Sequence, residues 1–289
     1  IYTLSLHDAL PIYYRITAAC VIAFAFIVIP QIFFSDINEP DIQSGLQPPG
    51  IEHFFGTDNL GRDLLLRSLD GLKLSLLLAF AVQIISVCMG VVIGILVAYF
   101  GGVADKIYIM VQNVIMSFPS IIAALSMILL LGTGLHSLVI ALCVTDWISY
   151  ARIVRSEVIT VRQLDYIHGS RAVGTSDFRI LFKHVLPNVI NPVIPIFTLM
   201  IGHTVLSISG LGFFGFGVQP PAAEIGLMIR DGLSYIGKAP WMFMLPGLML
   251  VVYSLLFNIL GDKMQDALSP QSELRSEEHT SELQSHYRI

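Results

Sequence analysis

The sequence predicts an all-α, polytopic membrane protein with about six transmembrane helices. Hydrophobic residues make up 55% of its 289 residues, charged residues only 13%, and the mean hydropathy is +0.75. A soluble protein of this length needs more polar surface to stay dispersed. Six segments also reach or approach the roughly 20 apolar residues that cross a bilayer as one helix.

The six predicted spans are separated by polar or glycine-containing connections. The fourth span is short and contains Asp146. Prolines crowd the start of the fifth, where neighbouring helices can satisfy the freed carbonyl groups. In chain order, we expect the spans at about 13–34, 74–100, 107–131, 135–150, 189–211 and 241–260.

The two ends of the chain differ in character from the rest. Residues 1–12 and 275–289 resemble translated sequencing-adapter read-through, so we interpret both as non-native, with ordinary mobile termini as the alternative. The remainder is predicted to comprise a first transmembrane helix at 13–34, an outer segment at 35–73, a transmembrane core at 74–262 and a cytoplasmic tail at 263–274.

Basic residues in the loops predict the orientation in the membrane. The loop at 151–187 carries six Lys and Arg residues, whereas the segment at 35–71 carries two. Because cytoplasmic loops carry an excess of Lys and Arg, the basic loop is predicted to be cytoplasmic and the earlier segment to lie outside. Six spans then place both termini in the cytoplasm.

The outer segment contains the motif FGTDNLGRD at 55–63. Thr57 or Asp58 is expected to cap a helix that begins near Asn59. The leucines that follow at helical spacing are typical of an amphipathic helix at the membrane surface. Alternatively, the charged side chains form a local ion-paired corner, a role that we favour over contact with a substrate. The structural motif predicted here comprises Gly56, Thr57, Asp58, Gly61, Arg62 and Asp63.

Three glycine patterns need separate interpretations. Gly90 and Gly94 form a GxxxG pattern that lets helices pack closely, either within the bundle or against a partner subunit. The run GLGFFG at 210–215 matches a dinucleotide fingerprint, but it follows an apolar helix rather than a strand, so it indicates a compact outer loop. The run GSRAVGT at 169–175 lacks the lysine of a P-loop, and no GxxxxGK[ST] motif exists in the chain. Another polypeptide must therefore bind any ATP.

Two ionisable residues fall inside predicted spans. Such a group is costly at membrane depth, so His203 is a candidate to line a cargo path. A neutral imidazole bonded to a neighbouring helix is the alternative, and Asp146 raises the same question. His203 could instead form the dyad of an intramembrane hydrolase with Ser207 or Ser209, although serine in an apolar helix usually bonds its own backbone.

The pattern of the basic loop predicts two helices around a turn. The first helix runs from about 152 to 173, and Gly174 ends it in a left-handed conformation. Thr175 or Ser176 then caps a short second helix, which Pro187 ends. Aromatic and charged residues on this second helix favour docking into the groove of a partner protein.

Within this loop, Gly174 is followed by Ile180, His184, Leu186 and Pro187. The pattern resembles the EAA loop of bacterial ABC importer permeases. More narrowly, it is similar to the C-type permease of dipeptide, oligopeptide and nickel transporters, over about 13–274. Supporting stretches are FGTDNLGRD at 55–63, YFGGVADK at 99–106, SFPS at 117–120, YARIVRSEV at 150–158, GFGVQPP at 215–221 and NILGDKMQDALSP at 258–270.

The resemblance implies the MetI-like fold of ABC importer permeases and a role as the transmembrane path of an ATP-driven importer. The implied partners are a second, B-type permease, two ABC ATPase subunits and an extracytoplasmic substrate-binding protein, in the lipid of a bacterial inner membrane. The chain itself is expected to have no catalytic residue and to bind no cofactor, metal or nucleic acid, since the ATPase subunits use the ATP. A coupling helix at about 176–182 is expected to transmit their movement. The implied coupling residues are Arg171, Ala172, Gly174, Ser176, Asp177, Phe178, Arg179 and Phe182.

Some stretches bear on cargo, and others depart from the family pattern. IGH at 201–203 and AEIGLMIRDGLSYI at 223–236 are more similar to nickel-type permeases than to the dipeptide type. The expected cargo is nickel, a metal chelate or a di- or oligopeptide, with strictly peptide cargo as the alternative. The Glu-Ala-Ala that names the loop motif is replaced by His168, Gly169 and Ser170, which narrows the expected ATPase contact to Gly174 and the helix after it.

Overall fold

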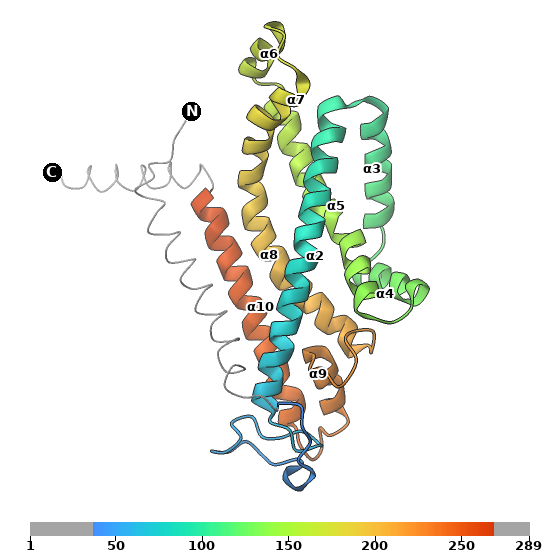
Figure 1. Ribbon diagram of the computed structural model, residues 1–289, viewed down its shortest axis with the longest axis vertical. Helices are drawn as coiled ribbons and strands as arrows, with labels where there is room; N and C mark the ends of the chain where they lie inside the picture. Colours follow the sequence, from blue (N-terminus) through green and yellow to red (C-terminus); the bar gives the residue numbers. More distant parts are fainter. Residues whose placement is uncertain (1–36, 269–289) are drawn as a thin grey trace, which may run out of the picture.

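The computed structural model of the protein describes residues 37–268. Four long helices lie side by side along the molecule (Figure 1): α2 (Leu64–Phe100), α5 (Leu135–Arg162), α8 (Leu186–Phe213) and α10 (Trp241–Leu268). The predicted first span at 13–34 and the two ends interpreted as non-native lie outside the described residues.

Shorter elements cover the two ends and one side of these helices. At one end lie α6 (Asp165–Ala172) and α7 (Asp177–Ile180), and a π-helical turn, η2 (Leu181–Val185), joins α7 to α8. At the opposite end lie α9 (Ile225–Leu233) and a short 3-10 turn, η1 (Ile42–Ser44) (Figure 1). Along the side lie α3 (Gly102–Met116) and α4 (Ser120–Leu131).

Within residues 37–268, four helical stretches are long and apolar enough to cross a membrane. A bent pair, α3 with α4, makes five if it counts as one span. The prediction of an all-α, polytopic membrane protein is therefore confirmed. The four stretches are Leu64–Phe100, Leu135–Arg162, Asp177–Phe213 and Trp241–Asp266.

The second predicted span begins earlier than its apolar run. Asp63 caps α2 by accepting a hydrogen bond from the Leu66 N–H at 2.9 Å. The prediction that Thr57 or Asp58 caps a separate surface helix near Asn59 is wrong. The leucines that suggested an amphipathic helix form the first turns of α2, and Leu64 is buried against α9 and the segment before it.

The third predicted span is not one straight helix over 107–131. It bends by 91° between α3 and α4, at Ser117, Phe118 and Pro119. Pro119 has no N–H for the helical ladder, and it disfavours helical geometry at the residue before it. The chain therefore turns at Pro119 and begins α4 at Ser120.

The basic loop is divided differently from the prediction. The helix expected at 152–173 is two helices, because α5 continues to Arg162 and α6 begins at Asp165. The second loop helix does not end at Pro187, which lies in the first turn of α8, where a missing N–H costs little. The π turn precedes it, and the Leu186 N–H bonds five residues back to the Leu181 carbonyl.

The last helix also extends beyond its prediction. α10 runs past residue 260 to Leu268, so the tail predicted at 263–274 begins inside this helix. Gly261 keeps it close to α8, because a Cβ atom at Gly261 would lie 2.4 Å from the Leu199 Cγ atom. No larger residue fits there without displacing α8.

The GxxxG pattern in α2 packs against α5 of the same chain. A Cβ atom at Gly90 would lie 2.5 Å from the Tyr150 Cβ atom, and one at Gly94 would lie 2.8 Å from the Ala151 carbonyl oxygen. The sequence left open whether this pattern packs within the bundle or against a partner. The structure places it within the bundle, where it brings α2 and α5 into close contact.

We expect Gly90→Ala to lower the free energy of unfolding by about 1–3 kcal/mol, because the added methyl group overpacks the α2–α5 contact. Gly247→Ala is the matched control on α10, where a Cβ atom would meet nothing within 4 Å. That substitution should be neutral or slightly stabilising. Thermal unfolding of both variants in lipid nanodiscs provides the measurement, and equal effects would contradict the packing argument.

Candidate functional site

The basic loop folds into a compact projection that we call the loop unit, residues 165–182. It comprises α6, the turn after it, α7 and the first two residues of the π turn, and it lies at one end of the long helices (Figure 1). Ile167 and Ile180 are fully buried and pack with Val161 and Val185 from α5 and the π turn. Apolar burial therefore fixes the inner side of the loop unit against the bundle.

Gly174 ends α6 as the sequence predicts. Its φ angle is +79°, in the left-handed region that glycine adopts at low cost. The Gly174 N–H bonds the Arg171 carbonyl at 2.9 Å, and the Thr175 N–H bonds the Ser170 carbonyl at 3.1 Å. These two bonds form a Schellman motif, which satisfies carbonyl groups at the end of α6 and reverses the chain. Ser176 then precedes α7 without a side-chain capping bond.

All eight predicted coupling residues have exposed side chains or backbone. Phe178 is 71% exposed and Phe182 is 58% exposed, and their ring centroids lie 4.5 Å apart. Exposed apolar side chains that gather in one place mark interaction sites. The eight residues that share this outer surface are Arg171, Ala172, Gly174, Ser176, Asp177, Phe178, Arg179 and Phe182.

The loop unit is also attached to the end of α2. The Tyr99 hydroxyl donates to the Asp177 carboxylate at 2.5 Å, and the Arg171 guanidinium lies 4.9 Å from the centre of the Tyr99 ring. Arg162 donates to the Ala98 and Tyr99 carbonyl groups at the C-terminus of α2. Sequence reasoning missed Tyr99, because an isolated tyrosine at the end of an apolar helix carries no sign of its partner.

At the opposite end, residues 41–63 form a structure that we call the outer corner. The buried Thr57 hydroxyl donates to the Ser44 carbonyl at 2.5 Å and accepts from the Gln47 N–H at 2.8 Å. Asp58 accepts two backbone N–H bonds and pairs with Arg62 at 2.7 Å. Asp58 and Arg62 are thus ion-paired, and their polar groups are engaged within the corner itself.

Two glycines of the motif close the outer corner. Gly56 and Gly61 have φ angles of +71° and +78°. A Cβ atom at Gly61 would lie 1.7 Å from the Asp41 carbonyl oxygen, so only glycine fits. Asp63 completes the motif by capping α2 and by contacting the His53 imidazole at 2.8 Å.

The GLGFFG run packs around a buried acid, Glu224. This side chain is 0% exposed, and its two oxygens accept the Gly226 and Leu227 N–H groups at 2.8 Å each, which caps α9. A Cβ atom at Gly212 would lie 1.9 Å from a Glu224 oxygen. Burial raises the pKa of Glu224 to about 7, although the two N–H bonds act in the opposite direction. The glycines therefore make room for an acid, not for a dinucleotide.

A polar network lies between the long helices. Its members are Gln83 on α2, Asp146 and Tyr150 on α5, and Thr204 on α8. The Gln83 amide donates to Asp146 at 2.7 Å, Thr204 contacts Asp146 at 3.2 Å, and the Tyr150 hydroxyl donates to the Gln83 carbonyl oxygen at 2.6 Å. Because hydrogen bonds satisfy these groups where lipid cannot, they tie three helices together.

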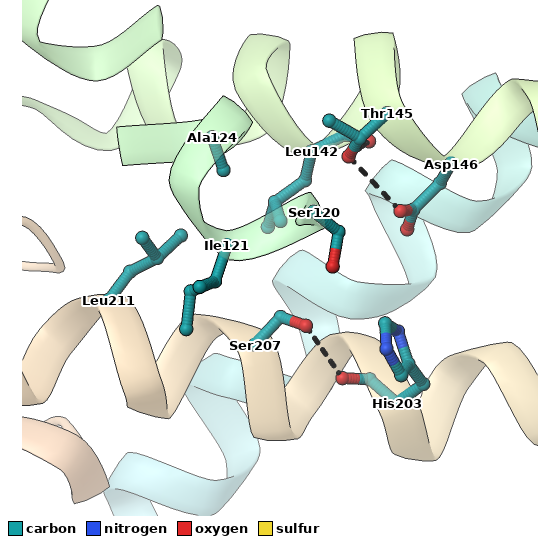
Figure 2. A pocket seen from close by; sticks show the side chains of 9 residues that line it. All are labelled: Ser120, Ile121, Ala124, Leu142, Thr145, Asp146, His203, Ser207 and Leu211. Atoms are coloured by element: carbon teal, nitrogen blue, oxygen red, sulfur yellow. Dashed lines mark hydrogen bonds between the residues drawn. The ribbon is translucent and has the colours of Figure 1, made fainter. Parts of the chain in front are cut away.

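A small pocket adjoins this network. It lies between α4, α5 and α8, and Figure 2 shows Asp146 and Thr145 on one side and His203 and Ser207 on the other. The Ser207 hydroxyl donates to the His203 backbone carbonyl at 3.0 Å, not to its imidazole. The dyad of His203 with Ser207 in the hydrolase hypothesis is therefore not formed. We call this space the polar pocket; its lining residues are Ser120, Ile121, Ala124, Leu142, Thr145, Asp146, His203, Ser207 and Leu211.

The chain matches one protein-family model over residues 90–273, described as "Binding-protein-dependent transport system inner membrane component". It is 35% identical over 251 residues to a putative peptide transport system permease protein of Brucella suis biovar 1 (strain 1330), covering 87% of this chain and 84% of that protein. It is 37% identical over 230 residues to the nickel transport system permease protein NikC of Escherichia coli (strain K12), covering 80% and 83%.

Other similarities concern a dipeptide permease and a solved structure. The dipeptide transport system permease protein DppC of Alkalihalophilus pseudofirmus is 35% identical over 242 residues, which cover 84% of this chain and 80% of that protein. A chain of the MetNI methionine ABC transporter superposes with a TM-score of 0.54 at 22% identity, covering 69% of this chain and 94% of the other. This last similarity confirms the MetI-like fold.

The burial of Glu224 makes the stability of the protein depend on pH. Because the pKa of Glu224 is raised from 4.5 to about 7, the folded chain keeps a proton that the unfolded chain releases between these values. The free energy of unfolding should therefore fall as pH rises from about 4.5 to 7 and level off above. We expect Glu224→Gln to flatten this part of the pH profile, measured as melting temperature between pH 5 and pH 8. Glu52→Gln, at an exposed position, should leave the slope unchanged.

The attachment of α7 to α2 generates a second prediction. Tyr99→Phe keeps the ring beneath Arg171 but removes the hydroxyl that holds Asp177, a bond to a charged group worth about 1.5–3 kcal/mol. Amide hydrogen exchange in residues 177–182 should become faster. Tyr108→Phe is the control, because the buried Tyr108 hydroxyl has no hydrogen-bond partner among residues 37–268. Unchanged exchange in Tyr99→Phe would show that the bond does not hold the loop unit.

Proposed function

The chain belongs to the family of binding-protein-dependent transport system inner membrane components, and we propose from this how it assembles and where its partners bind. It is a multi-pass permease subunit of an ABC importer, a transporter component and not an enzyme, and such permeases work with ATPase and substrate-binding partners. The intramembrane hydrolase hypothesis is rejected. We place the subunit in a bacterial inner membrane, beside a second, B-type permease and above two ATPase subunits.

The exposed surface of the loop unit carries this proposal. The Phe178 and Phe182 rings contact each other at a tilt of 38° and are exposed, and the basic residue Arg179 follows Phe178 in the sequence. A short helix with aromatic and charged side chains fits a groove in a partner protein. The chain has no P-loop lysine, so an ATPase subunit that binds here would supply the nucleotide site.

The connections of the loop unit indicate how movement reaches the membrane. α7 continues through the π turn into α8, and Asp177 is bonded to Tyr99 at the end of α2. A displacement of the loop unit would therefore act on two long helices at once. α2 and α8 both contribute to the polar network, where Gln83 and Thr204 meet Asp146. We propose that ATP-driven movement shifts these helices between two packed arrangements, which gives alternating access.

The cargo proposal follows the relatives and the sequence. Their printed descriptions name peptide, dipeptide and nickel transport, at 35%, 35% and 37% identity. We propose nickel, a metal chelate or a di- or oligopeptide as cargo, delivered by an extracytoplasmic binding protein, with strictly peptide cargo as the alternative. His203, which is exposed in this chain and lines the polar pocket, is proposed to face the cargo path.

The docking proposal is tested by two matched glycine substitutions. A Cβ atom at either Gly174 or Gly169 would meet nothing within 4 Å, but only Gly174 has a positive φ. Valine is strongly disfavoured at a positive φ. We expect Gly174→Val to distort the loop turn and to reduce both co-purification of the ATPase subunits and cargo uptake at least tenfold. Gly169→Val, within α6, should leave both within about twofold of wild type, since valine costs only a fraction of a kcal/mol in a helix.

Normal ATPase association and uptake in Gly174→Val would contradict docking at the loop unit. Phe178→Ala provides an independent check, because it removes exposed aromatic surface without changing the backbone. If Phe178→Ala retains full association, the aromatic pair does not form the contact.

A further inference from the structure

We propose that the polar pocket is a transit site for a primary ammonium group, such as the α-amino group of a peptide cargo. The inference rests on the proposed function, because it takes the pocket to adjoin the cargo path. No described similarity assigns a role to Asp146. Three features support such a site: the buried carboxyl group of Asp146, the groups that surround it and the size of the space beside it.

Asp146 is a buried carboxyl group that lines the polar pocket. It is 7% exposed and lies between long helices, and none of the ion pairs formed within residues 37–268 includes it. Its partners Gln83, Thr204 and Thr145 are all neutral donors. An unpaired carboxylate at membrane depth is costly, and such residues mark ion or substrate pathways by default. A cationic group in the pocket would supply the missing charge.

The Asp146 carboxyl group has acceptor capacity left on its Oδ1 atom. Gln83 and Thr204 both bond to Oδ2. The Thr145 hydroxyl lies 3.2 Å from Oδ1, but its single proton also lies within reach of the Leu142 carbonyl at 3.0 Å. A carboxylate accepts about four hydrogen bonds, so Oδ1 can accept from a bound group. In Figure 2 the Asp146 carboxylate and the His203 imidazole lie on opposite sides of the pocket.

The other polar lining suits a donor with several protons. An ammonium group has three N–H donors and no acceptor. An imidazole in its neutral form, such as His203 can supply, has one nitrogen that accepts, and the Ser120 and Ser207 hydroxyl oxygens accept as well. Together with Asp146 Oδ1, these groups provide more acceptors than one ammonium group needs.

The size of the pocket favours a small cation head. The cavity measures about 10 Å³, close to the space of one water molecule. A primary ammonium group is similar in size to water, whereas a guanidinium or a quaternary ammonium group is larger. Within residues 37–268, no group of three or more His, Cys, Asp and Glu side chains could hold a metal ion. The pocket therefore fits an amine better than bare nickel.

One feature of the pocket opposes a cation but does not cancel the charge. α4 begins at Ser120, so the positive end of its helix dipole lies near the pocket. A helix N-terminus is equivalent to about half an elementary charge, which is less than the full charge of Asp146. With Asp146 ionised, the sum of these two charges is negative.

The test measures binding of small probes to the full chain in lipid nanodiscs. Unfolding is followed with a thiol-reactive dye at Cys143, which is buried on α5, in a background where Cys20 and Cys88 are serine. The probes are methylammonium, tetramethylammonium and sodium chloride at equal ionic strength. We expect methylammonium alone to raise the melting temperature by about 2 °C or more, since a ligand stabilises the state that it binds.

Two variants separate charge from packing. Asp146→Asn removes the charge with little change in shape and should abolish the methylammonium shift. Thr204→Val removes one donor to Asp146 but keeps the carboxylate, so it should retain the shift. Loss of the shift in both variants would indicate that only the network geometry matters, and it would overturn the proposal.

The comparison of probes in the parent protein, which keeps Asp146 and Thr204, does not depend on the folding of the Asp146 or Thr204 variant. Equal shifts with methylammonium and tetramethylammonium, or no shift with either, would overturn the ammonium site. These outcomes would leave the permease assignment standing, because it rests on the family match, and docking at the loop unit is tested separately by ATPase association. Failure of ATPase association in turn would not change the probe result.

Discussion

The close contact of α2 with α5 at Gly90 and Gly94 is the constraint on which the rest of the structure depends. Without side chains at these positions, the two backbones approach to contact distance. Gln83 lies seven residues before Gly90 on α2. The close approach of the two helices brings it within hydrogen-bond distance of Asp146 and Tyr150 of α5. A wider separation would leave these polar groups unsatisfied in lipid, where each costs several kcal/mol.

α2 also connects the two functional ends of the chain. At its start Asp63 caps the helix from the outer corner, and at its end Tyr99 holds Asp177 of the loop unit. A continuous helix transmits displacement along its axis, whereas a loop would absorb it. α2 is thus attached at three places: the outer corner, the polar network and the loop unit. Through it, a displacement at one end of the chain can affect helix packing at the other end.

The sequence predicted the long helices well, because windows of about 20 apolar residues leave few alternatives. It predicted the left-handed turn at Gly174 for a similar reason, since few other residues end a helix in that way. It did not predict the π turn before Pro187 or the start of α2 at Leu64. Both depend on which backbone N–H and C=O groups are paired once the helices have packed. The periodicity of apolar side chains carries no information on this pairing.

The residues of the candidate sites also divide into those that the sequence could predict and those that it could not. Asp146 and His203 could be singled out, because an ionisable residue in an apolar run is conspicuous. Gln83, Thr204 and Tyr99 could not, because a single neutral polar residue in such a run becomes informative only when its partner is known. The structure supplies these partners from residues 58 to 121 positions apart in the chain.

The hydrogen-bond partners of the three buried acids distinguish structural from functional polar groups. Asp58 and Glu224 are buried acids whose oxygens accept hydrogen bonds from backbone N–H groups a few residues away. In both segments glycines lie where a Cβ atom would clash with neighbouring atoms. Their partners are local, so stabilising the fold accounts for them. Asp146 draws its main partners from two other helices and lines a pocket. Helix-to-helix bonds explain why Asp146 is tolerated, but they do not explain why a carboxyl group, where an amide could make similar bonds, lies beside that space.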